Sequence, residues 1–300
     1  PTTVGAAIAI VQHTTKLDLN IGIHDGAEVS GPTAVYQCDL QNNGVEGTSR
    51  ISILVDGGSF TSTVAGENAK AIDVQNITGF INGGNFVGLV TEGAIKTGYS
   101  LENGSIVADN PVANIGNKTF SSLLDAIDAA EDGDTIEFTG YTAAFNSLLV
   151  IEKGVNIEFA GQNQQITING AFTGPGIKFT SGSSSISGSG MIVDNRGING
   201  GNGFSSIVVE GPNATLTYSS KLQSYAPSTG YNGNLAFEVA DGAELILDGA
   251  VITEIAYPQA NSSNGGVGVF GPGESGKDNP TKLIVRGNTT ISVGRNLRER

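Results

Sequence analysis

The chain has 300 residues, of which 44 are glycine and only 15% are charged, and its 15 Lys and Arg against 29 Asp and Glu give a net charge of −14. Such an acidic surface repels nucleic-acid phosphates and anionic lipid headgroups, so neither is expected as a partner. The 38% of hydrophobic residues can build a core, and no run of about 18 apolar residues is present that could insert into a membrane.

Short apolar runs separated by turn residues recur along the whole chain. Val, Ile, Leu and Phe are grouped, and most groups are followed at once by Gly, Asn or Asp. β-Branched and aromatic residues favour strands, whereas these small residues favour turns, so the pattern predicts many short strands. The clearest runs, in chain order, are 8–11, 17–21, 51–55, 135–138, 155–159, 166–168, 176–179, 207–209, 245–247, 282–285 and 290–293.

The reactive residue types near the N-terminus favour structural roles. Cys38, the only cysteine, lies in an alternating stretch where a small buried side chain is expected. His13 and His24 lie on separate predicted strands, and neither has Cys or acidic neighbours at metal-ligand spacing. The glycine and aspartate nonapeptide of calcium-binding β-rolls is absent too. We therefore expect neither a metal site nor a cofactor.

A repeated unit indicates how the strands are arranged. Residues 55–60 (VDGGSF) and 81–86 (INGGNF) share one pattern and start 26 residues apart. Residues 239–245 (VADGAEL) similarly echo residues 23–29 (IHDGAEV). A period of 20–50 residues marks a solenoid, and one coil of three strands and three turns needs roughly 20–30 residues. We predict an all-β fold, a right-handed parallel β-helix whose inward residues stack from coil to coil.

One segment has a helical pattern instead. Phe120, Leu123, Leu124 and Ile127 follow the i, i+3, i+4, i+7 spacing, which predicts one apolar face on a helix over 121–131. Ser121 or Ser122 is the expected N-cap, and Gly133 is the expected stop.

This helix immediately precedes a strand run, as a cap over the open end of a β-solenoid would. We therefore predict two units, with residues 1–108 as the last coils of one solenoid and residues 109–300 as the helix-capped start of another. Both ends of the chain look cut from a longer protein.

Residues 113–136 (ANIGNKTFSSLLDAIDAAEDGDTI) resemble the start of modules in large surface proteins of gut Firmicutes. That start is a strand ending in Ile-Gly, an aromatic residue, a helix with Leu-x-x-Ala-Ile-x-x-Ala and then Asp-Gly-Asp-Thr-Ile; Asn117 and Leu124 are unusual in it. The stretch from Gly83 to Ser105 is similar to the Gly-Gly-Thr-Phe repeats that close such modules. The resemblance, which covers residues 80–136, implies a pectate-lyase-like β-helix on the bacterial cell surface with an adhesin-like role, and it does not imply lyase activity.

An enzyme with this fold needs clustered carboxylates, or calcium-binding carboxylates with an Arg or Lys base. Asp194, Arg196 and Asp248 are the candidates for a polysaccharide lyase or glycoside hydrolase. However, Asp194 and Asn195 directly follow the strand run 191–193, and an Asp-Asn pair at a strand end is ordinary turn chemistry. We favour the turn, and the enzyme stays as the alternative.

Tyrosines gather between residues 218 and 257, among loops rich in Ser, Asn and Pro. Exposed tyrosines on insertions between coils form binding surfaces, although they can equally pack the insertions against the solenoid wall. We predict Tyr225, Tyr231 and Tyr257 as the binding residues. The expected function is an extracellular, adhesin-like binding or spacer module that recognises a host glycan or a host protein, mucosal immunoglobulin among them.

Overall fold

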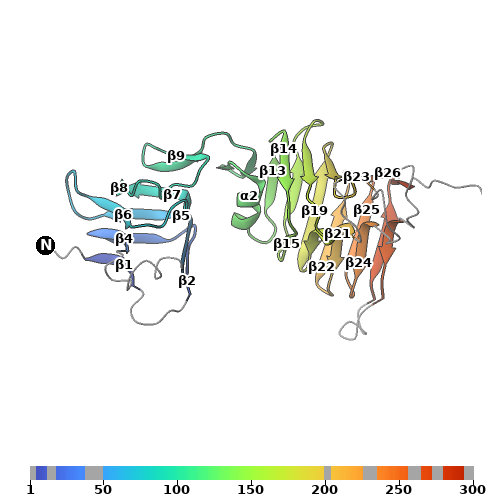
Figure 1. Cartoon of the computed structure of the whole chain (residues 1–300), viewed down its shortest axis with the longest axis horizontal. Coiled ribbons are helices and arrows are strands. Elements are labelled where there is room, and N and C mark those ends of the chain that lie inside the picture. The colour runs from blue at the N-terminus through green and yellow to red at the C-terminus, as the bar shows by residue number, and fades with distance from the viewer. Residues whose placement is uncertain are drawn as a thin grey trace, which may run out of the picture. The chain divides into compact units, whose positions relative to one another are not determined.

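The computed structural model describes residues 5–11, 18–37, 50–198, 204–225, 235–255, 265–271 and 280–293. Within these residues nearly all regular structure is β, and parallel strands stack as a solenoid beside one short helix (Figure 1). The predicted fold class is therefore confirmed. Contacts divide the chain into two compact units, Pro1–Pro111 with Thr119–Ser121 and Val112–Lys118 with Ser122–Arg300. The domain assignment of 1–108 and 109–300 stays a prediction.

The first unit contains two sheets. One has the order β1 (Ala6–Ile10), β4 (Thr33–Gln37), β6 (Lys70–Val74) and β8 (Leu89–Val90). The other has the order β2 (Leu19–Ile23), β5 (Ile51–Ser62), β7 (Ile81–Val87), β10 (Ser105–Ala108) and β9 (Tyr99–Glu102), and β3 (Glu28–Gly31) also pairs with β5. The pairings are parallel except around β10, which runs antiparallel to β7 and to β9.

The 26-residue repeat of the first unit is one coil. Val55 pairs with Ile81, and Phe60 pairs with Phe86, in the parallel ladder of β5 and β7. The two glycines of this repeat, Gly83 and Gly84, are needed for different reasons. A Cβ on Gly83 would lie 2.1 Å from the backbone oxygen of Asp56 in the coil before, whereas Gly84 has a φ of +102° that L side chains rarely adopt.

The second repeat, residues 23–29 and 239–245, also has the same local structure in both units, which is a turn between two strands. In the first unit Ala27 N–H donates to His24 O at 3.2 Å beside Gly26, whose φ is +78°. In the second unit Ala243 N–H donates to Ala240 O at 3.1 Å across a turn that also contains a positive-φ glycine, Gly242. The Asp-Gly pair therefore marks a corner of the solenoid in both units.

In the second unit each coil adds one strand to each of three sheets in turn. The eight-stranded sheet has the order β12 (Lys118–Phe120), β11 (Ala113–Ile115), β13 (Thr135–Phe138), β16 (Asn156–Phe159), β19 (Gly182–Gly188), β22 (Ala214–Tyr218), β25 (Glu244–Asp248) and β28 (Lys282–Arg286). The six-stranded sheet has the order β14 (Thr142–Phe145), β17 (Gln165–Ile168), β20 (Met191–Asp194), β23 (Lys221–Tyr225), β26 (Val251–Ile255) and β29 (Thr290–Val293). The five-stranded sheet has the order β15 (Leu149–Ile151), β18 (Gly174–Phe179), β21 (Phe204–Glu210), β24 (Leu235–Ala240) and β27 (Gly265–Val269).

The core of this unit consists of apolar columns that run from coil to coil. In the eight-stranded sheet Ile136, Ile157, Ile186, Tyr218 and Leu247 are in register, and all are buried. Strands lie about 4.8 Å apart, so each inward side chain packs directly on its equivalents above and below. Burying one such aliphatic side chain contributes about 1.5–3 kcal/mol, which makes each coil depend on its neighbours.

The predicted capping helix exists as α2 (Leu123–Ala129), with Ser122 as its N-cap. It packs against β11 and β13, and it therefore covers the first coil of the second unit as expected (Figure 1). Lys153 closes the other end, because its Nζ donates to Asp128 O at 2.8 Å and to Ala130 O at 2.5 Å.

The predicted apolar face of this helix is confirmed except at Leu124. Phe120, Leu123 and Ile127 are buried, although Phe120 lies in β12 before the N-cap, whereas Leu124 is 42% exposed. The face that is buried consists of Leu123, Ala126, Ile127 and Ala130, which also follow the i, i+3, i+4, i+7 spacing.

Candidate functional site

Asp194 and Arg196 form an ion pair inside the second unit, at the corner where β20 ends. Both side chains are 0% exposed, and Arg196 Nη2 lies 2.7 Å from Asp194 Oδ2. Arg196 also donates to Gly174 O and Ser205 O, and Ser206 Oγ donates to Asp194 Oδ2 at 2.7 Å. The Arg196 guanidinium further lies 4.5 Å from the ring centroid of Phe172. The two charges are compensated within the core, and neither side chain is exposed.

The third catalytic candidate lies elsewhere. Asp248 ends β25 in the eight-stranded sheet, and its Oδ2 accepts from Arg286 Nε at 2.9 Å on the partly exposed surface. Asp194 lies in the six-stranded sheet and is buried. The fold does not bring the three candidates together, and the turn interpretation of Asp194 and Asn195 agrees with the geometry.

The same interior column holds a second carboxyl. Residues Ile168, Asp194, Ser224, Glu254 and Val293 are in register through β17, β20, β23, β26 and β29. Glu254 is 3% exposed, and its Oε2 has no hydrogen-bond partner. Burial raises the pKa of Glu254 to about 8. Sequence reasoning missed this residue, although its position at the end of a strand run before a long polar segment was a visible signal.

The residues that follow this column form a neighbouring column, which is less buried. Asn169, Asn195, Tyr225 and Ile255 directly follow the in-register residues, and Tyr225 pairs with Ile255. Asn195 Nδ2 donates to Asn169 Oδ1 at 3.3 Å, and Gln223 Nε2 donates to the Tyr225 hydroxyl at 2.6 Å. Amide groups and one phenol therefore line the end of the six-stranded sheet.

The six- and five-stranded sheets are joined by several long connections. Between the six- and five-stranded sheets the first two coils use residues 146–148 and 169–173, and the next three use residues 195–203, 226–234 and 256–264. By contrast, the connections at the other two corners of these coils have at most five residues each, with the exception of residues 270–281. Because β20, β23 and β26 are adjacent strands, three long connections start at neighbouring positions.

Of the predicted binding tyrosines, Tyr225 is the one within the described residues, and it lies at this corner. Tyr225 is the last residue of β23 and is half-buried. Tyr231 and Tyr257 lie outside the described residues, in the connections 226–234 and 256–264. Tyr218 has a different role, because it is fully buried and packs edge-on against Phe237 with ring centroids 4.9 Å apart. Burial raises the pKa of Tyr218 well above its usual value.

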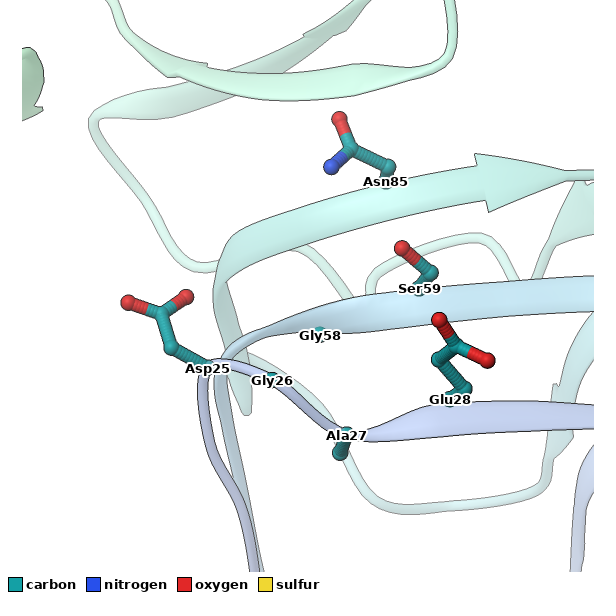
Figure 2. A pocket seen from close by; sticks show the side chains of 7 residues that line it. All are labelled: Asp25, Gly26, Ala27, Glu28, Gly58, Ser59 and Asn85. Atoms are coloured by element: carbon teal, nitrogen blue, oxygen red, sulfur yellow. The ribbon is translucent and has the colours of Figure 1, made fainter.

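The first unit presents a shallow polar pocket of about 170 Å³. Figure 2 shows that its side chains come from the turn at Asp25 and from three strands, with Glu28 on β3, Ser59 on β5 and Asn85 on β7. Glu28 pairs with Ser59, and Ser59 pairs with Asn85, so the lining is one outward row of the sheet.

His24 is a surface residue that hydrogen-bonds to Asp56. His24 Nδ1 lies 2.8 Å from Asp56 Oδ1, and the His24 side chain is 63% exposed. His13 and Cys38 lie outside the described residues. Among the described residues, no group of three His, Cys, Asp or Glu is arranged to hold a metal ion.

Comparison of the chain with protein-family models, curated proteins and solved structures gives no match. In the part of the chain that the structure describes, no helix is long and apolar enough to cross a membrane. The surface-protein resemblance of residues 80–136 is thus supported at the level of a β-solenoid fold alone, and ligand, partner and location must be proposed from the site.

Proposed function

We propose that the chain is a binding module of an extracellular bacterial surface protein, in which the solenoid is a rigid support and ligand is held at one corner of the second unit. The observation that carries this proposal is the set of three long connections that start from the adjacent strands β20, β23 and β26. Loops that vary on a regular scaffold are where binding residues concentrate. A scaffold held by in-register columns keeps such loops at fixed spacing, which lowers the entropy lost on binding.

The side chains beside these connections favour a neutral glycan as the ligand. Asn169, Asn195 and Gln223 supply amides that donate and accept hydrogen bonds, and Tyr225 supplies a phenol. Such groups match sugar hydroxyls on one side and the apolar face of a sugar ring on the other. The net charge of −14 opposes sulfated or acidic glycans. A host protein, mucosal immunoglobulin among them, is the other ligand class that we test.

The polysaccharide-cleaving alternative receives less support. Its candidate acid and base, Asp194 and Arg196, are 0% exposed and bonded to each other. A general acid or base must come within hydrogen-bond reach of its substrate, and these two do not reach the surface. Asp248 is engaged by Arg286 in another sheet.

The proposal is tested by offering the full chain to an array of neutral glycans, acidic glycans and host mucosal proteins. We expect neutral glycans to bind, and Tyr225→Ala and Asn195→Ala to weaken binding by at least about tenfold, as loss of a contact at the centre of an interface does. Tyr141→Ala is the matched control, because Tyr141 is 77% exposed at a different corner, between β13 and β14.

Three outcomes contradict the proposal. Neutral-glycan binding that both variants leave unchanged would mean that the site lies away from this corner. Binding of host proteins alone would rule out a glycan as the ligand. Release of new reducing or unsaturated ends from a polysaccharide panel would favour the enzyme function instead.

A further inference from the structure

Glu254 is one of two carboxyls in its column among the described residues. Phe145 and Ile168 are buried and apolar, Ser224 is a small buried hydroxyl, and Val293 on β29 is apolar and exposed. Asp194, two coils away, is the only other carboxyl of this column among the described residues. A buried carboxylate costs several kcal/mol unless a cation or hydrogen-bond donors compensate it, so the surroundings of the two carboxyls decide their charge.

The charge of the Asp194 carboxylate is compensated by two side chains that have no equivalent in the coil of Glu254. The first is Arg196, two residues on in the chain, whose Nε and Nη2 both bind the Asp194 carboxylate. The second is Ser206, whose hydroxyl donates to Asp194 from the five-stranded sheet. Two coils further on, the register places Gly266 where Ser206 stands, because Ile207 aligns with Phe237 and Phe237 with Val267. Glycine offers no side-chain donor.

The ionisable residues on strands that pack against β26 are directed elsewhere. On β23, Lys221 is exposed, and Tyr225 is bonded to Gln223. On β25, Glu244 pairs with Lys282, and Asp248 pairs with Arg286.

On β24, which adjoins β23, Glu238 accepts from Ser205. The described parts of β27 and β29 contain no ionisable residue. No described cation therefore faces Glu254, and its Oε2 has no donor.

We propose that Glu254 is a proton-operated lock: the coil of β26 stays closed while the Glu254 carboxyl is neutral, and ionisation of this carboxyl loosens β26. The lock does not require that this corner bind a glycan. The raised pKa of Glu254, about 8, agrees with the geometry and places the change near neutral and mildly alkaline pH.

The direction in which pH shifts the opening of this coil follows from proton linkage. Between pH 4.5, the ordinary value for this carboxyl, and about pH 8, the folded coil keeps a proton that the opened coil loses. Raising the pH therefore favours the opened coil by up to about tenfold per pH unit within this window. Below the window both states hold the proton and above it neither does, so the opening equilibrium becomes independent of this group.

The first experiment compares amide hydrogen exchange of β26 in the full chain and in Glu254→Gln, at matched pH values from 4.5 to 9.5. We expect the wild-type chain to lose protection relative to the variant through the window and to level off above it. Glu158→Gln, which alters an exposed carboxyl on β16, is the control and should track the wild-type chain. A ratio of wild-type to Glu254→Gln exchange that stays constant with pH overturns the proposal.

A second experiment does not depend on how well the variant folds. The infrared band of a protonated carboxylic acid should be present in the wild-type chain at pH 7 and should disappear as the pH rises through about 8. A spectrum at pH 7 in which every carboxyl is ionised overturns the lock. If the lock holds but no glycan binds the array, only the proposed function fails.

Discussion

Phe60 and Phe86 lie one coil apart in the first unit, with their ring centroids 4.9 Å apart and their planes 7° from parallel. Both rings are buried, and the two residues pair directly in the parallel ladder. The 26-residue repeat thus does more than set the strand positions, because it places one aromatic ring on the next. Stacked rings contribute about 0.5–1.5 kcal/mol beyond their buried area.

Phe60→Ala should therefore destabilise the first unit by about 3–5 kcal/mol, since it removes both the buried ring and its stacking on Phe86. The measurement is hydrogen exchange of β5 and β7 in the full chain, which separates this unit from the other. Val87→Ala, at a 63% exposed position directly after Phe86, should change little. Equal effects of the two substitutions would show that the ring stack does not hold the coils together.

Gly83→Ala should be costly for a different reason. The added Cβ would lie 2.1 Å from Asp56 O, and backbone cannot move aside as a flexible side chain can. Overpacking of this kind typically costs about 1–3 kcal/mol, and here it should also weaken the register of β7 on β5. Gly5→Ala is the control, because its nearest neighbour would be an ordinary contact at 3.7 Å. Thermal unfolding of both variants checks the difference, and a harmless Gly83→Ala would refute the close approach.

The capping helix gives the third prediction. Ile127→Asp should destabilise the start of the second unit by about 3 kcal/mol or more, because Ile127 is 3% exposed and the new carboxylate would have no partner. Leu124→Asp should cost less than about 0.5 kcal/mol, since Leu124 is at the solvent side. Denaturant unfolding monitored at β13 distinguishes the two. Comparable losses would mean that the helix turns its other face to the coil.

The helix also shows how far sequence reasoning reaches. The spacing of apolar residues located the segment and its N-cap, but two overlapping sets satisfy the same spacing. One set contains the large residues Phe120 and Leu124, and the other contains the small residues Ala126 and Ala130. Side-chain size favours the first set, whereas the structure buries the second set together with Phe120, which precedes the helix, and leaves Leu124 exposed.

The binding corner was predictable only in part. The sequence shows tyrosines and polar loops between residues 218 and 257, which is where Tyr225 and the connection 226–234 lie and where the connection 256–264 begins. It does not show that these connections share a corner, because paired residues are 21 apart between β13 and β16 but 38 apart between β25 and β28. With such unequal coils, Asp194, Ser224 and Glu254 align only once the strands are paired.

The last prediction concerns the buried pair in this column. Arg196→Met should destabilise the second unit by about 3–5 kcal/mol, because it leaves the Asp194 carboxylate buried with Ser206 as its remaining side-chain donor. Asp194→Asn should also be costly, since it leaves the Arg196 guanidinium uncompensated. If the two residues act mainly on each other, the double variant should cost clearly less than the two single variants together.

Denaturant unfolding of the four chains measures this coupling. Lys282→Met, which removes an exposed partner of Glu244, is the control and should cost at most about 1 kcal/mol. The same variants address the discarded catalytic interpretation, because a buried structural pair affects glycan binding only through loss of folding. An Arg196→Met chain that unfolds like the wild type but loses a cleavage activity would mean that this pair acts on substrate and that the corner opens far enough to admit it.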